Sequence, residues 1–478
     1  MRFVSIKVLA LFVISLLIAS CGYKTSENIN KQKKNVLFIA VDDLRLQAGI
    51  YGQSQMITPA IDELGNDGVV FNRAYCSVPV CGASRASLLS GLRPTSKRFV
   101  NYHTWKDKDA PDVTSIPKWF KENGYTTLSR GKIYHHSDDD LEAWSEEPYI
   151  PAAGISWRSY ITEESRKIIE ANKNPKNPDQ VKGPPFEMAD VEDNAYPDGM
   201  LTDKVIEDLN QFAKSKEPFF LGVGFWKPHL PFNAPKKYWD LYSEEDIQLA
   251  DNPFMPQNAP KKAKTDWYEL RGMYAGIPKE GPVSDELARQ LIHGYYACVS
   301  YTDAQIGKVL KELKRLGLDK NTVVVLWGDH GWHLGEHGLW CKHCNFDKVM
   351  KAPLMFKAPG MKEGKKSNTL VEFIDIYPTL CDLAGIDMPE HLDGKSLQPV
   401  LNNPSKIHKD TVFTRYHSGE SVITKRYVYT EWKKKNGNKV NMLYDHSNDP
   451  DENINVADNP KYEEVVKELS LKINKNHD

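Results

Sequence analysis

A cysteine at position 81 begins the stretch of this chain with the clearest chemical potential. It opens the run CGASRASLLSG, residues 81–91, in which small residues follow the cysteine, Arg85 stands four positions later and Gly91 ends the run. This pattern predicts a short helix whose N-terminus places amide donors and a positive dipole beside Cys81, an environment that suits a tetrahedral anion. Taken alone, the same residues are also compatible with an ordinary activated thiol.

Carboxylate and histidine side chains follow three apolar runs of strand length. The runs are residues 36–41, 219–225 and 323–327, and the polar residues near their ends are Asp42, Asp43, His229, Asp329 and His330. Because sites in open α/β sheets lie outside the carboxyl ends of the strands, we expect these side chains to face a common site.

The elements that must position these residues alternate between strand-like and helix-like segments, which predicts a doubly wound α/β sheet. Helices are expected at residues 59–68, 114–123 and 285–316, and a further strand at 125–128. Residues 138–198 are rich in proline, asparagine, glutamate and lysine and show little periodicity. We therefore expect a long surface excursion there, which shapes the substrate entrance.

The sequence pattern changes near residue 406 to short alternating runs with Asn436-Gly437 as a turn, and it ends in a helical pattern at residues 460–473. This change predicts a small antiparallel α+β subdomain over residues 406–478. The catalytic domain is then expected over residues 35–405.

Composition places the chain among globular proteins. Its 478 residues include 40% hydrophobic and 26% charged residues, which can bury a large core and exclude a disordered or fibrous chain. The formal net charge is -2 and the lysines are scattered, so the charge pattern does not indicate nucleic-acid binding. Any anionic substrate must therefore be held by a local site.

The N-terminus has the pattern of an export signal. A short charged start and an apolar run over residues 8–18 lead into LIASC, residues 17–21, which resembles a bacterial lipobox. We expect a signal peptide over residues 1–21, a lipid on Cys21 that anchors the chain to the membrane, and a polar tether over 22–34. The exported chain would lie at the periplasmic or cell-surface face of a bacterial outer membrane. An ordinary cleaved signal with an incidental cysteine is the alternative.

Seven cysteines bear on the redox state of the chain. If Cys21 carries a lipid and Cys81 acts chemically, five remain, and an odd number in an exported protein leaves at least one free thiol. Cys341 and Cys344 form a C-x-x-C, without the second ligand pair of a zinc site or the setting of a redox protein. We interpret this pair as structural or as an optional disulfide.

Residues 81–91 resemble the signature of the type I sulfatases, Cys-x-Pro-x-Arg followed by a Leu-Thr-Gly-like ending, with Ala83 in place of the usual proline. Four further motifs resemble the iduronate-2-sulfatase branch of that family and occur in the same order. They are Asp42-Asp43, GKIYH at residues 131–135, KPHLPF at 227–232 and GDHGWHLGEHGLWCK at 328–342. The resemblance implies an alkaline-phosphatase-like fold, with a large mixed sheet flanked by helices, that hydrolyses sulfuric esters.

The resemblance also implies the nucleophile. In that family a dedicated formylglycine-generating enzyme oxidises the signature cysteine to formylglycine, which here would be derived from Cys81. The hydrated aldehyde would attack sulfur, and its second hydroxyl would then expel sulfate. Arg85 would orient this diol.

Four further side chains take roles from the same resemblance. Lys132 and Lys342 would neutralise charge on the sulfate oxygens. His135 would take the diol proton, and His229 would protonate the departing sugar oxygen. A lone histidine or lysine is more often structural, and the matched motifs are what favour these roles.

The resemblance implies a calcium site as well. Asp42, Asp43 and Asp329 offer the hard carboxylate oxygens that calcium prefers. His330 stands in the adjoining ligand position, although imidazole is an unusual calcium ligand, and Cys81 completes the set. The cation would polarise a sulfate oxygen and the formylglycine hydroxyl.

Other residues give weaker signals. The tryptophans that could wall a sugar-binding cleft are Trp105, Trp226, Trp332 and Trp340. For Trp332 and Trp340 the alternative is simple packing beside the metal loop. His333 and His337 have the spacing of a zinc pair on a helix, but the glycines around them favour a loop. We therefore do not predict them as ligands.

The expected substrate is a sulfated carbohydrate. Resemblance to the iduronate-2-sulfatases suggests 2-O-sulfated uronic acids, and bacterial relatives also act on algal polymers such as ulvan. Two alternatives stay open: a phosphatase or phosphonate monoester hydrolase of the same fold, and a non-catalytic glycan-binding lipoprotein.

Overall fold

The computed structural model describes residues 33–154, 158–173, 182–265, 269–361, 364–433 and 439–476. The expected signal peptide, the lipid site at Cys21, most of the tether and the Asn436-Gly437 turn lie outside the described residues. Residues Lys34–Asp478 form one compact unit. In the described part of the chain, no helix is long and apolar enough to cross a membrane.

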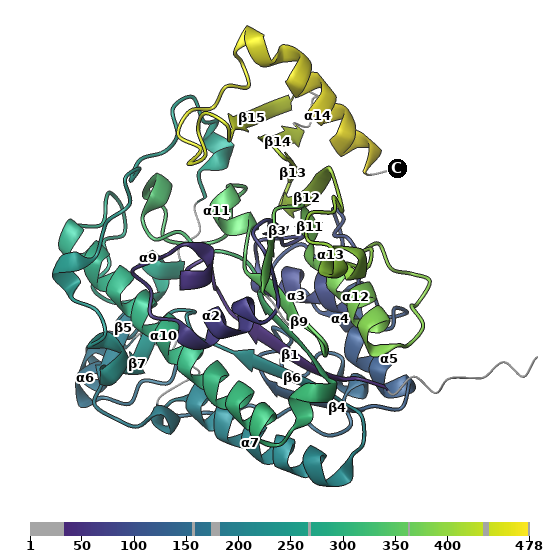
Figure 1. Cartoon of the computed structure of the whole chain (residues 1–478). Helices are drawn as coiled ribbons and strands as arrows, with labels where there is room; N and C mark the ends of the chain where they lie inside the picture. Colours follow the sequence, from purple (N-terminus) through teal and green to yellow (C-terminus); the bar gives the residue numbers. More distant parts are fainter. Residues whose placement is uncertain are drawn as a thin grey trace, which may run out of the picture. The chain divides into compact units, whose positions relative to one another are not determined.

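A seven-stranded sheet runs through the centre of this unit (Figure 1). Its strands, in spatial order, are β10 (Lys365–Ser367), β2 (Val69–Phe71), β9 (Leu354–Lys357), β8 (Thr322–Gly328), β1 (Asn35–Val41), β6 (Phe219–Phe225) and β4 (Thr126–Gly131). Strand β9 is antiparallel to both of its neighbours, and the other neighbouring pairs are parallel. The sheet is therefore mixed, and the predicted α/β fold is confirmed.

Strand β1 shows why helices cover both faces of the sheet. Its residues Leu37, Ile39 and Val41 belong to one apolar core, and the alternate residues Val36, Phe38 and Ala40 belong to another. The first core is closed by α2 (Pro59–Asn66), α7 (Pro197–Ser215) and α10 (Asp285–Arg315). The second is closed by α3 (Cys81–Ser90), α5 (Ile116–Glu122) and α12 (Ile376–Ala384). A strand buried on both sides has to be apolar throughout, as residues 36–41 are.

The segment expected to be a long surface excursion, residues 138–198, contains regular structure in its described part, although its sequence shows little periodicity. It includes α6 (Glu163–Ala171) and β5 (Phe186–Ala189), and β5 pairs with β7 (Phe232–Pro235). The buried carboxylate of Glu187 accepts hydrogen bonds from the backbone amides of residues 161 and 162. This anchoring by one side chain leaves no periodic signal in the sequence.

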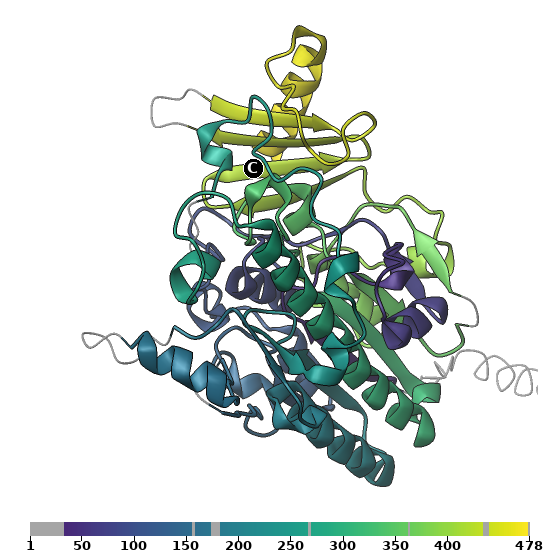
Figure 2. The ribbon, with the colours of Figure 1, turned by 90° about the vertical axis from the view of Figure 1, so that its left-hand side faces the viewer.

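Four antiparallel strands near the C-terminus confirm the predicted α+β pattern there (Figure 2). They are β12 (Thr411–Tyr416), β13 (Gly419–Thr424), β14 (Tyr427–Lys433) and β15 (Lys439–Asp445), and α14 (Glu463–Lys475) packs on them. The first strand also reaches the segment before Cys81: the amide of Arg415 donates to the carbonyl of Ser77 at 2.8 Å. The C-terminal sheet therefore supports the loop that carries the signature cysteine.

Short elements complete the framework. They are β3 (Ala74–Tyr75), β11 (Val371–Glu372), α4 (Lys106–Asp109), α8 (Lys236–Trp239), α9 (Glu269–Met273), α11 (Asp347–Met350) and α13 (Gln398–Asn402). All six cysteines in the described residues are buried free thiols. Cys341 and Cys344 are therefore not bridged, and the structural interpretation of that pair holds over the disulfide.

Candidate active site

Two neighbouring strands deliver the predicted carboxylates to one edge of the sheet. Asp42 and Asp43 follow β1, and Asp329 follows β8, which pairs with β1. The amide of Asp43 donates to Oδ1 of Asp329 at 3.0 Å, and all three side chains are buried. The backbone at Asp43 has a φ of 59°, which turns the chain sharply after the strand. The edge predicted from the apolar runs thus brings three carboxylates together.

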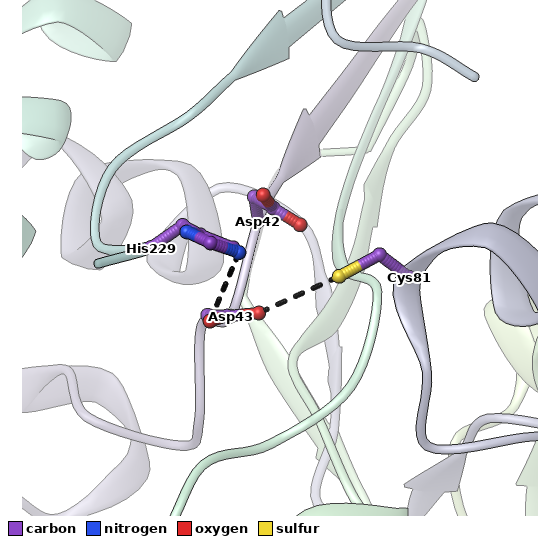
Figure 3. A group of neighbouring side chains, drawn as sticks. All are labelled: Asp42, Asp43, Cys81 and His229. Carbon is purple, nitrogen blue, oxygen red and sulfur yellow. Dashed lines mark hydrogen bonds and ion pairs between the residues drawn. The ribbon is translucent and has the colours of Figure 1, made fainter. Parts of the chain in front are cut away.

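Cys81 is the first residue of α3, as the small-residue run predicts, and its side chain points towards Asp42 and Asp43 (Figure 3). Its Sγ lies 3.2 Å from Nε2 of His330 and 3.7 Å from Oδ1 of Asp43. A Cβ on Gly82 would come within 2.8 Å of the carbonyl oxygen of Tyr102, so the turn requires a glycine there. Ala83, the departure from the family signature, lies in a buried apolar cluster.

The candidate metal ligands form a compact set. Ligand atoms of Asp42, Cys81, Asp329 and His330 all lie within 4.8 Å of one another, and a second such group joins Asp42 and Cys81 to Asp43 and His229. The two groups contain every residue predicted as a ligand. Three buried carboxylates offer hard oxygen donors, and this chemistry fits a divalent cation such as calcium.

Arg85 forms ion pairs with two of these carboxylates. Its guanidinium donates to Oδ2 of Asp329 at 2.9 Å and to Oδ1 of Asp42 at 3.3 Å, and the side chain is fully buried. It also donates to the carbonyls of Lys132 and Ile133. Burial alone would lower the pKa of Arg85, but Asp329 and Asp42 raise it above its usual value. Arg85 therefore stays charged and fixes two candidate ligands.

Two lysines reach the same carboxylates from other segments. Nζ of Lys132 lies 2.5 Å from Oδ2 of Asp42, and Nζ of Lys342 lies 2.8 and 2.9 Å from the two oxygens of Asp43. Burial would lower the pKa of each lysine, but Asp42 and Asp43 respectively raise it above the usual value. Burial would likewise raise the pKa of Asp42, yet Lys132 and neighbouring cations hold it well below its usual range. These ion pairs keep positive charge beside Cys81.

The two predicted catalytic histidines differ in their surroundings. Burial, reinforced by Lys132, lowers the pKa of His135 to about 2, so its imidazole is neutral at physiological pH. Its Nδ1 has no hydrogen-bond partner among the described residues, which suits a proton acceptor. His229 donates from Nδ1 to the carbonyl of Leu230 at 2.6 Å, and its Nε2 lies 3.9 Å from Oδ2 of Asp43.

A cavity of about 450 Å³ opens in front of Cys81. The predicted residues that line it are Cys81, Lys132, His135, His229 and Lys342. The sequence did not predict Tyr102, Glu269, Met273 and His343, which line it too. His343 directly follows Lys342, so the motif could have indicated it, whereas Glu269 belongs to no motif.

The weaker sequence signals have mixed outcomes. Trp226 lines the cavity, whereas Trp332 and Trp340 are buried side chains and Trp105 stacks on His136 at 4.1 Å. The cleft role is therefore retained for Trp226 among the four tryptophans. His333 lies in a loop and His337 in the 3-10 turn Glu336–Gly338, so the two are not on an α-helix, and they belong to neither candidate metal group found in the described residues.

Two family models match this chain. The model described as Sulfatase matches residues 34–386, and the model described as N-sulphoglucosamine sulphohydrolase, C-terminal, matches residues 335–478. The second match includes the four antiparallel strands and the terminal helix. The central sheet and the C-terminal sheet are therefore each matched by a family model.

Individual relatives agree with these matches. Iduronate 2-sulfatase from Homo sapiens is 34% identical over 418 residues, which cover 79% of this chain and 74% of the relative. The ulvan-active sulfatase of Formosa agariphila is 29% identical and covers 99% and 87%. A solved phosphonate monoester hydrolase from Silicibacter pomeroyi superposes with a TM-score of 0.73 at 23% identity, over 93% of this chain and 95% of that chain. That structural likeness concerns the fold alone.

Proposed function

The chain belongs to the sulfatase family, and from that premise we propose that this hydrolase of sulfated saccharides removes 2-O-sulfate from uronic acid residues with formylglycine at Cys81 and calcium. One observation carries the proposal. Cys81 lines the cavity together with two charged lysines, and its side chain lies beside three buried carboxylates. Cations and a nucleophile within one cavity suit the cleavage of an anionic ester.

The unmodified thiol makes a poor nucleophile in this environment. Burial and the charge of Asp42 raise the pKa of the Cys81 thiol well above its usual value, so the thiolate is scarce at neutral pH. Formylglycine at this position would supply a hydroxyl nucleophile instead. Neutral His135 can accept the proton of that hydroxyl, and Lys132 and Lys342 can bind sulfate oxygens.

Mass spectrometry tests the proposed modification. The peptide that contains Cys81 is isolated from protein made in its native host and from the same protein made in a heterologous host. We expect the aldehyde mass in the first sample, and a lower fraction in the second if Ala83 limits recognition by the modifying enzyme. An unmodified thiol throughout the native sample would favour a glycan-binding lipoprotein.

Calcium would be held by Asp42, Asp43, Asp329 and His330 next to position 81, where it would supply positive charge for a sulfate oxygen. The thermal midpoint of unfolding is measured after chelation and after addition of calcium or zinc. We expect calcium to restore the midpoint, because ligand binding to the native state stabilises it. Restoration by zinc and not by calcium would contradict the proposed ion.

Desulfation of defined sulfated oligosaccharides, read by mass, tests the substrate. We expect release of the 2-O-sulfate from a hexuronate disaccharide, because this chain is 34% identical to an iduronate 2-sulfatase over 418 residues. Similarity to an ulvan-active sulfatase over 99% of this chain favours a second candidate, sulfated ulvan oligosaccharides. Loss of sulfate from another position alone would refute the 2-O assignment.

A comparison of 4-nitrophenyl sulfate with 4-nitrophenyl phosphate tests the phosphoryl alternative. We expect faster turnover of the sulfate. Faster cleavage of the phosphate would favour the phosphonate hydrolase reading that the shared fold leaves open.

We further propose that the chain is exported and anchored by a lipid on Cys21, on the strength of its lipobox-like sequence. Cells that express the full chain or Cys21→Ala are separated into membrane and soluble fractions. The variant should leave the membrane fraction; equal membrane retention of both proteins would contradict the anchor.

A further inference from the structure

Glu269 is a cavity residue that no motif of the chain contains. It is the first residue of α9, its side chain is 14% exposed, and it lines the cavity beside His229 and Lys342. Its Oε1 lies 3.2 Å from Nε2 of His229, and its Oε2 lies 3.4 Å from Nζ of Lys342. One carboxylate thus touches two groups of the proposed reaction.

The distances separate these two contacts. Lys342 is already fixed by both oxygens of Asp43, at 2.8 and 2.9 Å, so Glu269 adds little to its position. For His229 the order is reversed, because Nε2 is closer to Glu269 than to Asp43, which lies 3.9 Å away. Lys342 therefore helps to hold Glu269, and Glu269 in turn holds His229.

Both ring nitrogens of His229 face acceptors. Nδ1 donates to the carbonyl of Leu230 at 2.6 Å, and Nε2 faces the carboxylate of Glu269. These two contacts fix the rotation of the ring and keep Nε2 at the cavity, beside Glu269.

We propose that Glu269 is the positioning residue of the general acid: it holds the His229 ring so that Nε2 stays at the cavity, where the departing oxygen reaches it. The inference rests on the proposed sulfatase mechanism. As the ester S–O bond breaks, its electron pair goes to the departing sugar oxygen, and the proton of Nε2–H transfers to that oxygen to form the alcohol. His229 then keeps the proton on Nδ1 and recovers the other from water.

Leaving groups of different basicity distinguish this role from a structural one. A sugar alkoxide needs protonation as it departs, whereas 4-nitrophenolate leaves without it. For Glu269→Ala we expect kcat for a 2-O-sulfated hexuronate disaccharide to fall about 30-fold with KM changed less than about threefold, and turnover of 4-nitrophenyl sulfate to fall less than about threefold. Glu269→Gln keeps an acceptor oxygen and should lose less than Glu269→Ala.

Controls separate the role from folding and from charge. Glu286→Ala removes an exposed glutamate in the first turn of α10 and should leave both substrates unaffected. In a His229→Ala background, Glu269→Ala should cost less than about threefold, because the group it positions is gone. Equal losses on both substrates, or full additivity in the double variant, would overturn the proposal.

A spectroscopic measurement tests the contact without turnover. In ¹⁵N-histidine-labelled protein, the ring signals of His229, assigned from the spectrum of His229→Gln, should shift in Glu269→Ala and stay in place in Glu286→Ala. Unchanged signals in Glu269→Ala would overturn the proposal. Failure of the wild-type protein on every sulfate ester, with the shift present, would instead reject the proposed function and leave the contact established.

Discussion

The two sides of the candidate active site are built differently. The sulfate side, Asp42, Asp43, Cys81, Arg85 and Asp329, has side chains at most 3% exposed, held at strand ends and at the start of α3. The leaving-group side, His229 and Glu269, has side chains 11% and 14% exposed, held on a loop and on the five-residue α9. The fold itself therefore fixes the groups that would handle sulfate, whereas the groups that would meet the sugar lie on segments where substitution costs less stability.

Removal of the nucleophile should have the largest effect. We expect Cys81→Ala to lower turnover of any sulfate ester by about 10⁴-fold or more, because the reaction loses its covalent route. Initial rates on the hexuronate disaccharide measure the loss. Cys76→Ala is the matched control, since Cys76 is also a buried free thiol but does not line the cavity. Activity in Cys81→Ala within tenfold of wild type would place the nucleophile elsewhere.

Substitution of Arg85 should show that the sulfate side contributes more to the free energy of unfolding than the leaving-group side. Arg85→Met removes the guanidinium partner of the buried carboxylate of Asp329 and leaves Asp42 paired with Lys132 alone, and we expect the free energy of unfolding to fall by about 3–5 kcal/mol. Urea unfolding of the calcium-loaded protein measures the change. On the leaving-group side, His229→Gln should cost less than about 1 kcal/mol.

The surface variant Arg166→Met controls for the loss of one positive charge, because that side chain is 52% exposed. Similar losses in Arg85→Met and His229→Gln would show that the two sides are equally embedded in the fold, and the contrast would then fail.

The same contrast explains what the sequence could predict. Apolar strands followed by carboxylates indicate a sheet edge, so the sequence alone could place Asp42, Asp43 and Asp329 together. The helix at Cys81 followed from its small residues and its terminal glycine. These patterns are local in the sequence, and packing of the sheet core brings the residues that they predict together in space.

The rest depends on contacts between distant segments. Glu269 reaches His229 across 40 positions of chain through a helix too short to show periodicity. Strands β5 and β7 have four residues each, and one buried glutamate anchors the loop beside them. The antiparallel direction of β9 is also invisible in its sequence, because an apolar run has the same composition in either direction.

A substitution of His135 tests whether this residue also belongs to the sulfate side. It lines the cavity as a neutral imidazole, since burial lowers its pKa to about 2. His135→Gln should lower kcat about 10²-fold, the lower end of the contribution of a general base, because so low a pKa makes the imidazole a weak proton acceptor. The adjacent His136→Gln is the matched control, because His136 stacks on Trp105 and does not line the cavity. A loss confined to KM would indicate substrate binding rather than proton transfer.

The smallest expected effect is the acid sensitivity of the loop behind the sulfate side, which carries Asp329, His330 and Lys342. In this loop His333 is fully buried, and burial, with His337 nearby, lowers its pKa to about 3. The unfolded chain binds a proton at this residue below pH 6.5 and the folded chain does not. The contribution of His333 to the free energy of unfolding is therefore fully present above pH 6.5. It is lost as the pH drops towards 3, and the loss reaches about 2 kcal/mol at pH 5.

His333→Gln should remove this contribution. Unfolding free energies of the variant and the wild type, measured between pH 8 and pH 5, should converge by about 2 kcal/mol at the acid end. His103→Gln, a change at an exposed histidine, should leave the wild-type slope intact. Parallel curves for His333→Gln and the wild type would mean that the loop accepts a proton without strain. The loop behind the sulfate side would then be less rigid than the buried ion pairs of that side indicate.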